Sequence, residues 1–161
     1  MTKRIKPAFA AACLMLVLIP VTYFFNHNTY MLNWKKSDLV QYKFAEIINE
    51  TPNATLLNYG GLDFGFFTAA NITPNIRFFE KQNIPYERFP QNLDEHNKYI
   101  MGKEIDYIVF RLDVDEDIAT LNVPFLKDNY TLVSTSKQKY EDEEFIYALF
   151  KLKDSRLTRD G

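Results

Sequence analysis

The densest group of residues able to carry chemistry lies in residues 54–77, ATLLNYGGLDFGFFTAANITPNIR. An apolar run typical of a buried strand is followed there by Gly60, Gly61 and Asp63. Adjacent glycines let backbone N–H groups converge on a phosphate, and a carboxylate can hold a metal ion. Because α/β proteins place ligands just beyond the carboxyl ends of their strands, this turn is the first candidate site.

The spacing of the glycines favours a structural turn over a phosphate site. Gly60, Gly61 and Gly65 form a GGxxxG pattern, which matches neither the dinucleotide fingerprint nor the P-loop. We therefore expect a strand-to-helix turn with unusual backbone angles, in which Asp63 caps the following helix. The candidate ligand-binding residues of this segment are Asp63, Phe67, Thr68 and Asn71.

The other titratable residues do not form a recognisable catalytic or metal site. The acids within residues 113–117 lack the glycine and the terminal glutamate of a calcium loop. His96 has acidic neighbours and no second histidine close by, so we expect it to face solvent. No serine has a histidine partner, and a single cysteine forms neither a disulfide nor a thiolate zinc site. The sequence predicts no catalytic residue, no metal ion and no cofactor.

Asparagine begins an N-x-Ser/Thr pattern at four positions, namely Asn49, Asn53, Asn71 and Asn129. Such patterns are glycosylation acceptors only in a host that modifies asparagine. Pro74 follows the third pattern directly and makes it a poor acceptor.

Composition limits the class of protein. A chain of 161 residues, of which 47% are hydrophobic and 16% aromatic, has room for one domain and a short extra element. Its net charge of -2 argues against a nucleic-acid partner, which requires a basic face. Five phenylalanines suit either a platform facing sugar or lipid or, as the favoured interpretation, a packed core: Phe64, Phe66, Phe67, Phe78 and Phe79.

Residues 7–25 predict a membrane anchor. This uncharged run approaches the roughly 20 residues that span a bilayer as a helix. A cleaved signal would need small residues after the apolar run, and a lipoprotein would need that run before Cys13, so a retained transmembrane helix fits best. Lys3, Arg4 and Lys6 place the amino terminus in the cytoplasm, although Lys35 and Lys36 weaken the asymmetry. The predicted segments are a cytoplasmic N-terminus (1–6), a transmembrane helix (7–25), a juxtamembrane connector (26–36), an extracytoplasmic domain (37–153) and a disordered tail (154–161).

The pattern from Ser37 onward predicts alternating helices and strands. Ser37 is expected to cap a helix that ends before Pro52. Further strands are expected at 54–59, 76–80 and 105–112. Short helices are expected after Asp63 and after the acids of 113–117, and a longer helix at 92–104. A hairpin is expected from strands at 130–139 and 145–152 joined by a turn of about five residues. The predicted fold is α/β, with a small, mostly parallel sheet, crossover helices and a C-terminal antiparallel hairpin, preceded by one transmembrane helix.

Residues 58–85 and 99–111 carry a family resemblance. The chain reads DFGFFTAA at 63–70, PNIRFF at 74–79 and GKEIDYIV at 102–109. These segments resemble the strand, the D-x-G-F-Y-T-A-A turn and the two later strands of the extracytoplasmic C-terminal domain of bacterial protein-mannosyltransferase-like enzymes of the GT-C superfamily. Those enzymes are multi-pass membrane glycosyltransferases that use polyprenyl-phosphate sugars.

The resemblance implies a non-catalytic domain that acts in cell-envelope glycosylation. The family carries its catalytic acid in an early outer loop among many spans, whereas this chain has one span, so no catalytic residue is carried over. The expected partners are the bilayer, through residues 7–25, and a multi-pass glycosyltransferase or an envelope glycan. Two alternatives stay open: a membrane-anchored interaction or structural module, and a small nucleotide-binding enzyme that uses the Gly60–Gly61 turn.

Overall fold

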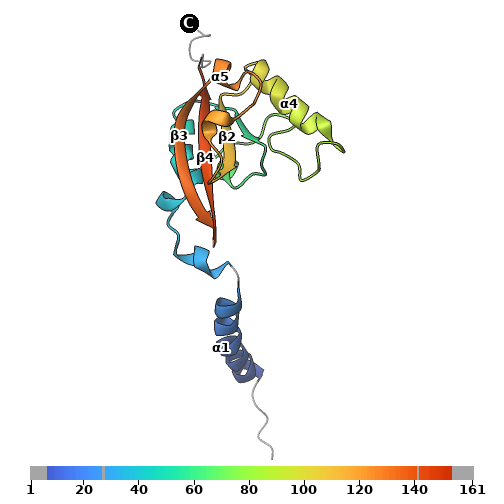
Figure 1. Cartoon of the computed structure of the whole chain (residues 1–161). Coiled ribbons are helices and arrows are strands. Elements are labelled where there is room, and N and C mark those ends of the chain that lie inside the picture. Colours follow the sequence, from blue (N-terminus) through green and yellow to red (C-terminus); the bar gives the residue numbers. More distant parts are fainter. Residues whose placement is uncertain (1–6, 27, 141, 154–161) are drawn as a thin grey trace, which may run out of the picture. The chain divides into compact units, whose positions relative to one another are not determined.

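The computed structural model describes residues 7–26, 28–140 and 142–153, which belong to two compact units, Met1–Lys35 and Lys36–Gly161 (Figure 1). The predicted cytoplasmic N-terminus at 1–6 and the predicted disordered tail at 154–161 lie outside the described residues. Each unit is described separately below.

The first unit consists of a long apolar helix and a short connector. Helix α1 (Pro7–Phe25) has the bounds predicted for the transmembrane helix, and it continues through Pro20. Among the described residues it is the one helix long and apolar enough to cross a membrane. The 3-10 helix η1 (Thr29–Asn33) follows, and the rings of Tyr30 and Trp34 meet edge to face with centroids 5.4 Å apart.

The second unit is built on a four-stranded mixed sheet. Its strands are β1 (Leu56–Tyr59), β2 (Tyr107–Asp113), β3 (Tyr130–Tyr140) and β4 (Glu143–Leu152), in the order β1-β2-β4-β3. Only β1 and β2 are parallel, whereas β4 pairs antiparallel with both β2 and β3. The α/β class and the hairpin are confirmed, but the prediction of a mostly parallel sheet is not.

The predicted strand at 76–80 is the main error of the fold prediction. That segment contributes one bridge, between Asn58 and Glu80, and no named strand. Strand β1 ends at Tyr59, and the next residue, Gly60, has a φ of 72° that takes the chain out of extended geometry. The ladder beside β1 therefore stops after a single bridge, and the sheet gains no second parallel pair on this edge.

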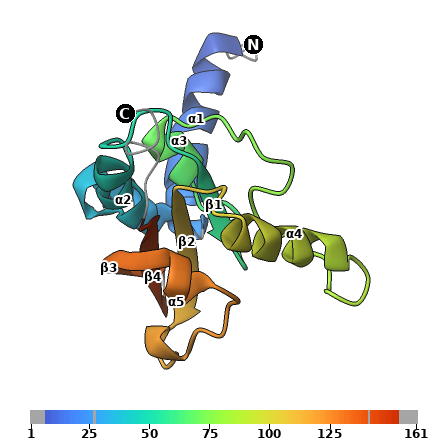
Figure 2. The same ribbon diagram turned by 90° about the horizontal axis from the view of Figure 1, so that it is seen from above.

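Helices cover both faces of the sheet (Figure 2). On one face, α2 (Val40–Ile48) and α3 (Phe66–Ala70) pack through Phe44, Phe66 and Ala70 against Val109, Tyr147 and Leu149. On the other face, α4 (Pro90–Met101) and α5 (Leu126–Asn129) pack against the sheet. Contacts there join Ile100 and Leu126 to Ile108, Phe110 and Phe150.

The start of α2 shows how a distant residue replaces a local cap. Ser37 does not cap this helix, because it lies in the 3-10 helix η2 (Lys36–Asp38) and its hydroxyl donates to Asp38 Oδ1. Helix α2 begins at Val40 instead, and the Val40 N–H donates to Gln138 Oε1 of β3 at 3.1 Å. Gln138 is 98 positions further along the chain, so no local pattern signals this contact.

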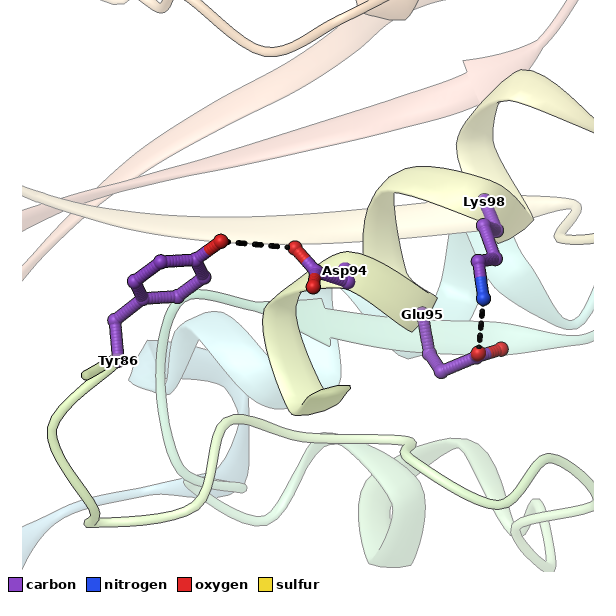
Figure 3. Close-up of polar contacts among 4 residues, drawn as sticks. All are labelled: Tyr86, Asp94, Glu95 and Lys98. Atoms are coloured by element: carbon purple, nitrogen blue, oxygen red, sulfur yellow. Dashed lines mark hydrogen bonds and ion pairs between the residues drawn. The ribbon is translucent and has the colours of Figure 1, made fainter. Parts of the chain in front are cut away.

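Helix α4 buries polar residues that the apolar pattern did not select. Its inner residues Asn92, His96 and Ile100 recur at a spacing of four, and His96 is 0% exposed. The prediction of a solvent-facing His96 is therefore wrong. The outer surface carries the charges instead, where Lys98 pairs with Glu95 and the Tyr86 hydroxyl donates to Asp94 (Figure 3).

The predicted strand at 105–112 and the predicted helical turn after residues 113–117 match the structure closely, whereas the hairpin connection differs in length. Strand β2 begins two residues after the start of the predicted strand at 105–112 and ends one residue beyond it. The acids at 113–117 precede the 3-10 helix η3 (Ile118–Thr120), and the Asp117 carboxylate accepts the Ala119 N–H at 2.9 Å. The hairpin strands run on to Tyr140 and from Glu143, so their connection is shorter than the predicted five residues.

Candidate functional site

Asp63 is a structural residue of the turn after β1. Its Oδ1 accepts the N–H of Phe66, the first residue of α3, at 3.0 Å. The same oxygen accepts the Asn58 side-chain amide at 2.8 Å, and the Asp63 N–H donates to Glu80 Oε2 at 2.6 Å. The predicted capping role is confirmed, because the carboxylate compensates a free N–H of the first helical turn.

The glycines of the turn supply backbone freedom. Gly60 and Gly65 have φ of 72° and 91°, in the left-handed region that side chains disfavour. Gly65 directly precedes α3 and allows the chain to enter the helix at once. The predicted structural role of these glycines is confirmed.

The aromatic side chains of this segment fill the core. Phe66 is 1% exposed, and its ring lies 5.8 Å from that of Phe44 and 5.5 Å from that of Tyr147. Phe67 is also buried and meets Phe79 edge to face at 5.2 Å. The core interpretation is thus confirmed for Phe66 and Phe67, and Phe67 is not available to a ligand.

Little space remains at the carboxyl end of β1. The cavity there measures about 10 Å³, room for roughly one water molecule. It is lined by Asn58, Tyr59, Gly61, Leu62, Phe64, Phe66, Val109, Arg111 and Tyr147. The first candidate site of the sequence therefore holds no ligand-sized cavity.

A much larger cavity lies at the opposite end of the same strand. It measures about 490 Å³, within the range of roughly 300–1,000 Å³ for small-molecule sites. Its walls are the segment that leads into β1 and the segment that leaves α3. The lining residues are Asn49, Thr51, Pro52, Asn53, Ala54, Ala70, Asn71, Ile72, Thr73 and Asn75.

Of the four candidate ligand-binding residues, only Asn71 reaches this cavity. Thr68 lies exposed on α3 outside it, and Asp63 and Phe67 are committed to the turn and the core. Sequence reasoning missed Asn49, Asn53 and the hydroxyl residues as members of a site. No local pattern groups these residues, because they meet only through the packing of α2 against α3.

Buried hydrogen bonds hold one wall of the cavity in place. Thr51 Oγ1 lies 2.8 Å from the Tyr107 hydroxyl, which donates to the carbonyl of Ile47 at 3.2 Å. Asp106 Oδ2 accepts both the N–H and the hydroxyl of Thr55 at 2.8 Å. The segment leading into β1 is therefore fixed at Thr51 and at Thr55 to the start of β2 and the residue before it.

The backbone at the rim is also defined. Asn53 and Asn71 have φ of 53° and 54°, the left-handed conformation that asparagine tolerates better than most residues. Asn71 follows α3, and its N–H bonds to the Thr68 carbonyl at 3.2 Å. Asn49 follows α2 with a right-handed backbone, φ of -71°, and its N–H bonds to the Ala45 carbonyl at 2.9 Å. The ends of two helices thus present asparagine side chains to one cavity.

Six of the ten lining residues are polar, four are apolar, and none is charged. None of its side chains is titratable or aromatic, so it offers amide and hydroxyl groups for hydrogen bonding and no group for proton transfer. Helix C-termini carry partial negative charge, which disfavours anions. The cavity is chemically suited to bind a neutral ligand rich in hydroxyl groups.

His96 contributes to packing and not to this cavity. Burial lowers the pKa of His96 to about 4, although contacts to the backbone of Phe78 and Glu80 act in the opposite direction. The imidazole is therefore neutral at neutral pH. It lies beside the ring of Tyr59, with centroids 5.7 Å apart, and holds α4 against the edge of the sheet.

Comparisons with protein families, curated proteins and solved structures find no match to this chain. The resemblance to the outer domain of membrane glycosyltransferases therefore stays a prediction.

Proposed function

We propose that this chain is a single-pass membrane protein whose outer domain binds a neutral glycan and serves cell-envelope glycosylation without catalysing transfer. The observation that carries the proposal is the uncharged cavity of about 490 Å³ lined by four asparagines and two threonines. Relatedness to the outer C-terminal domain of multi-pass glycosyltransferases belongs to the same proposal. The motif DFGFFTAA at 63–70 is its sequence support.

The chemistry of the cavity favours a sugar over an ionic ligand. Carboxamides donate through NH₂ and accept through the carbonyl oxygen, and the Thr73 hydroxyl does both. The Thr51 hydroxyl is bonded to Tyr107 and supports the wall. A sugar hydroxyl also donates and accepts, so it pairs with either group. A charged ligand would find no countercharge among the lining residues. Specificity would arise because an unpaired hydroxyl or amide in the closed complex costs about 1–3 kcal/mol.

Binding is tested on the full chain in a polyoxyethylene detergent, which contains neither sugar nor phosphate. The probes are mannobiose, maltose, lactose and chitobiose, and the readout is calorimetry. We expect saturable binding of at least one disaccharide, lost in Asn71→Gly and retained in Thr68→Ala. Thr68 lies on the adjacent helix outside the cavity, so it is the matched control. Equal binding by wild type and Asn71→Gly, or binding of none, would contradict the proposal.

Anchoring by α1 is the second part of the proposal. The helix has the length and composition of a span, and Tyr30 and Trp34 follow it as interfacial aromatics do. Trp34 is the single tryptophan of the chain, so its fluorescence reports one position. In bilayers, we expect stronger quenching by lipids brominated near the headgroup than by lipids brominated near the chain end. No quenching by either lipid would exclude the anchor.

The proposed orientation places the amino terminus in the cytoplasm because Lys3, Arg4 and Lys6 precede the span. Cys13 is the single cysteine, so a Cys13→Ala background carrying Asn122→Cys has one thiol on the outer domain. Asn122 is exposed. We expect a membrane-impermeant maleimide to label intact cells, whereas labelling only after lysis would reverse the orientation.

A second candidate function is a membrane-anchored interaction module. It is favoured by β3, which forms one edge of the sheet over 11 residues and exposes Leu132 and Val133. Exposed edge strands pair with strands of other chains. Chemical crosslinking in solubilised membranes distinguishes the two functions, since a stoichiometric partner captured through β3 in a chain that binds no glycan would favour this alternative.

A further inference from the structure

Arg111 is an exposed arginine whose side chain is held between two aromatic rings. Its guanidinium carbon lies 4.6 Å from the ring centroid of Phe64 and 4.5 Å from that of Phe145. Phe64 comes from the turn after β1, and Phe145 comes from β4. Two elements distant in sequence thus position one cation. A cation over an aromatic face is attracted by the negative charge density of the ring.

The arrangement leaves the hydrogen-bonding edge of the guanidinium without an acidic partner. Arg111 forms no ion pair with any residue that the structure describes. Asp113 lies two positions further along the same strand face, and it makes no ion pair with Arg111. Aromatic rings occupy the faces of a guanidinium, whereas its five N–H groups lie in the plane. The Tyr147 hydroxyl interacts with the Arg111 side chain and is its neutral partner there.

The neighbouring polar groups are compatible with an anion. Arg111 is paired across the ladder with Tyr147, which places the two side chains on one face of the sheet. Burial raises the pKa of the Tyr147 hydroxyl, and Arg111 acts in the opposite direction, so this group is neutral. The hydroxyl is buried and donates to Tyr140, so it adds no negative charge that would oppose an anion at Arg111. The Tyr147 hydroxyl lies 3.4 Å from that of Tyr140. No carboxylate lines the small cavity beside Arg111.

We propose that Arg111 binds a phosphate group, with the rings of Phe64 and Phe145 fixing the plane of the guanidinium. A positioned arginine recognises such oxyanions through two parallel N–H bonds, and little rotational freedom is lost on binding. This site is separate from the amide-lined cavity. The phosphate can be dissolved or part of a lipid headgroup, and only the lipid source rests on the proposed membrane anchoring.

The test uses the full chain in polyoxyethylene detergent and inorganic phosphate as the probe. Phosphate is titrated at constant ionic strength against chloride. The backbone amide signal of residue 111 is followed by NMR in every variant, and the Arg111 Nε–H signal is followed in the variants that keep this arginine. We expect a saturable shift in the wild type and about tenfold weaker binding in Arg111→Lys, because lysine keeps the charge and loses the planar fork. Arg77→Lys is the matched control, since Arg77 stacks on a single ring, that of Phe78, among the residues that the structure describes.

Unfolding temperature is measured for both variants to confirm that they remain folded. A variant of Phe145, Phe145→Leu, tests the same site without touching the charge, and we expect it to weaken phosphate binding several-fold. The proposal is overturned if the phosphate shift equals the chloride shift, or if Arg111→Lys binds phosphate as the wild type does.

Nanodiscs distinguish the two sources of phosphate. If the Arg111 signal moves when phosphatidic acid is added to phosphatidylcholine nanodiscs, a headgroup reaches the site. If it moves only with dissolved phosphate, the ligand is a free phosphate compound. No movement in either case contradicts the proposal, whereas it leaves glycan binding in the other cavity unaffected.

Discussion

The two ends of the β1–α3 unit differ in what fills them. At the carboxyl end of β1, Asp63 bonds to the turn, Phe66 fills the core and about 10 Å³ remains empty. At the amino end, asparagines and threonines surround a cavity of about 490 Å³. The usual rule places the ligand site of an α/β fold at the carboxyl end. In this chain the ligand-sized space lies at the other end.

The difference has a physical origin in the side chains. The turn residues at the carboxyl end are bulky and apolar or hydrogen-bonded to one another, so they close the space. The residues after α2 and α3 are small and polar, and Asn49 and Asn71 stay exposed. A packed end is expected to respond to substitution with a loss of stability, and an open end with a loss of binding.

The largest expected effect is at the packed end. Phe66→Ala removes a ring that contacts Phe44 and Tyr147 and leaves a cavity, so we expect the free energy of unfolding to fall by about 3–5 kcal/mol. Urea denaturation of the full chain in detergent, followed by near-UV circular dichroism, measures it. Thr68→Ala, on the exposed side of the same helix, is expected to stay within about 0.5 kcal/mol. Equal losses of unfolding free energy in Phe66→Ala and Thr68→Ala would contradict the expected difference between the packed and the exposed side of α3.

The next effect is a pH dependence that His96 introduces on the packed side. Its folded-state pKa of about 4 lies below the ordinary 6.5, so the unfolded chain takes up the proton first. Stability is therefore complete above pH 6.5 and falls by about 3 kcal/mol as the pH reaches 4. Denaturation midpoints at pH 7 and pH 4 measure the loss.

His96→Gln is the control for this pH dependence. It removes the titrating group, so the difference between the two pH values is expected to shrink by about the same amount. Carboxylates titrate in both proteins and cancel in the comparison. An unchanged difference would show that His96 does not carry the effect.

A smaller loss is expected when the cap of α3 is removed. Asp63→Ala deletes the acceptor for Phe66 N–H and for the Asn58 amide, and we expect a cost of about 1–2 kcal/mol. Asp63→Asn keeps one oxygen acceptor and is expected to lose less. If both variants lost neutral glycan binding while remaining stable, Asp63 would belong to a site and the proposed division of the two ends would be wrong.

The smallest effect on stability is expected at the open end. Asn53→Gly and Asn71→Gly remove an amide at positions with φ of 53° and 54°, where glycine is unstrained. We expect the free energy of unfolding to change by less than about 1 kcal/mol in each variant. Thermal unfolding of the same samples used for binding measures it. A loss above 2 kcal/mol would make these asparagines structural.

Local patterns predicted the elements that depend on local chemistry. The helix at 7–25, the strand near 105–112, the hairpin and the Asp63 cap follow from apolar runs and side-chain capping, and the structure confirms them. Contacts between distant residues account for the errors. Gln138 caps α2 in place of Ser37, and His96 is buried because α4 packs its Asn92–His96–Ile100 side inward.

The cavity could not be predicted from local patterns either, because contacts between distant residues form it. Its walls come from residues 49–54 and 70–75, which meet only because α2 packs against α3 on one face of the sheet. Taken alone, each asparagine is typical of a helix end or a turn. The sequence therefore identified Asn71 as a candidate without its companions, and it placed the candidate site at the carboxyl end of β1, away from the larger cavity.

The most direct test of the contrast is to locate where a neutral disaccharide binds. Two-dimensional amide NMR of the full chain resolves the side-chain NH₂ groups of asparagine. With mannobiose, maltose, lactose or chitobiose in turn, the account predicts shifts at Asn49, Asn53, Asn71 and Asn75, and none at Asn58 or at the Gly60–Gly61 backbone. Shifts confined to Asn58 and the glycine turn would contradict it and return the site to the carboxyl end of β1.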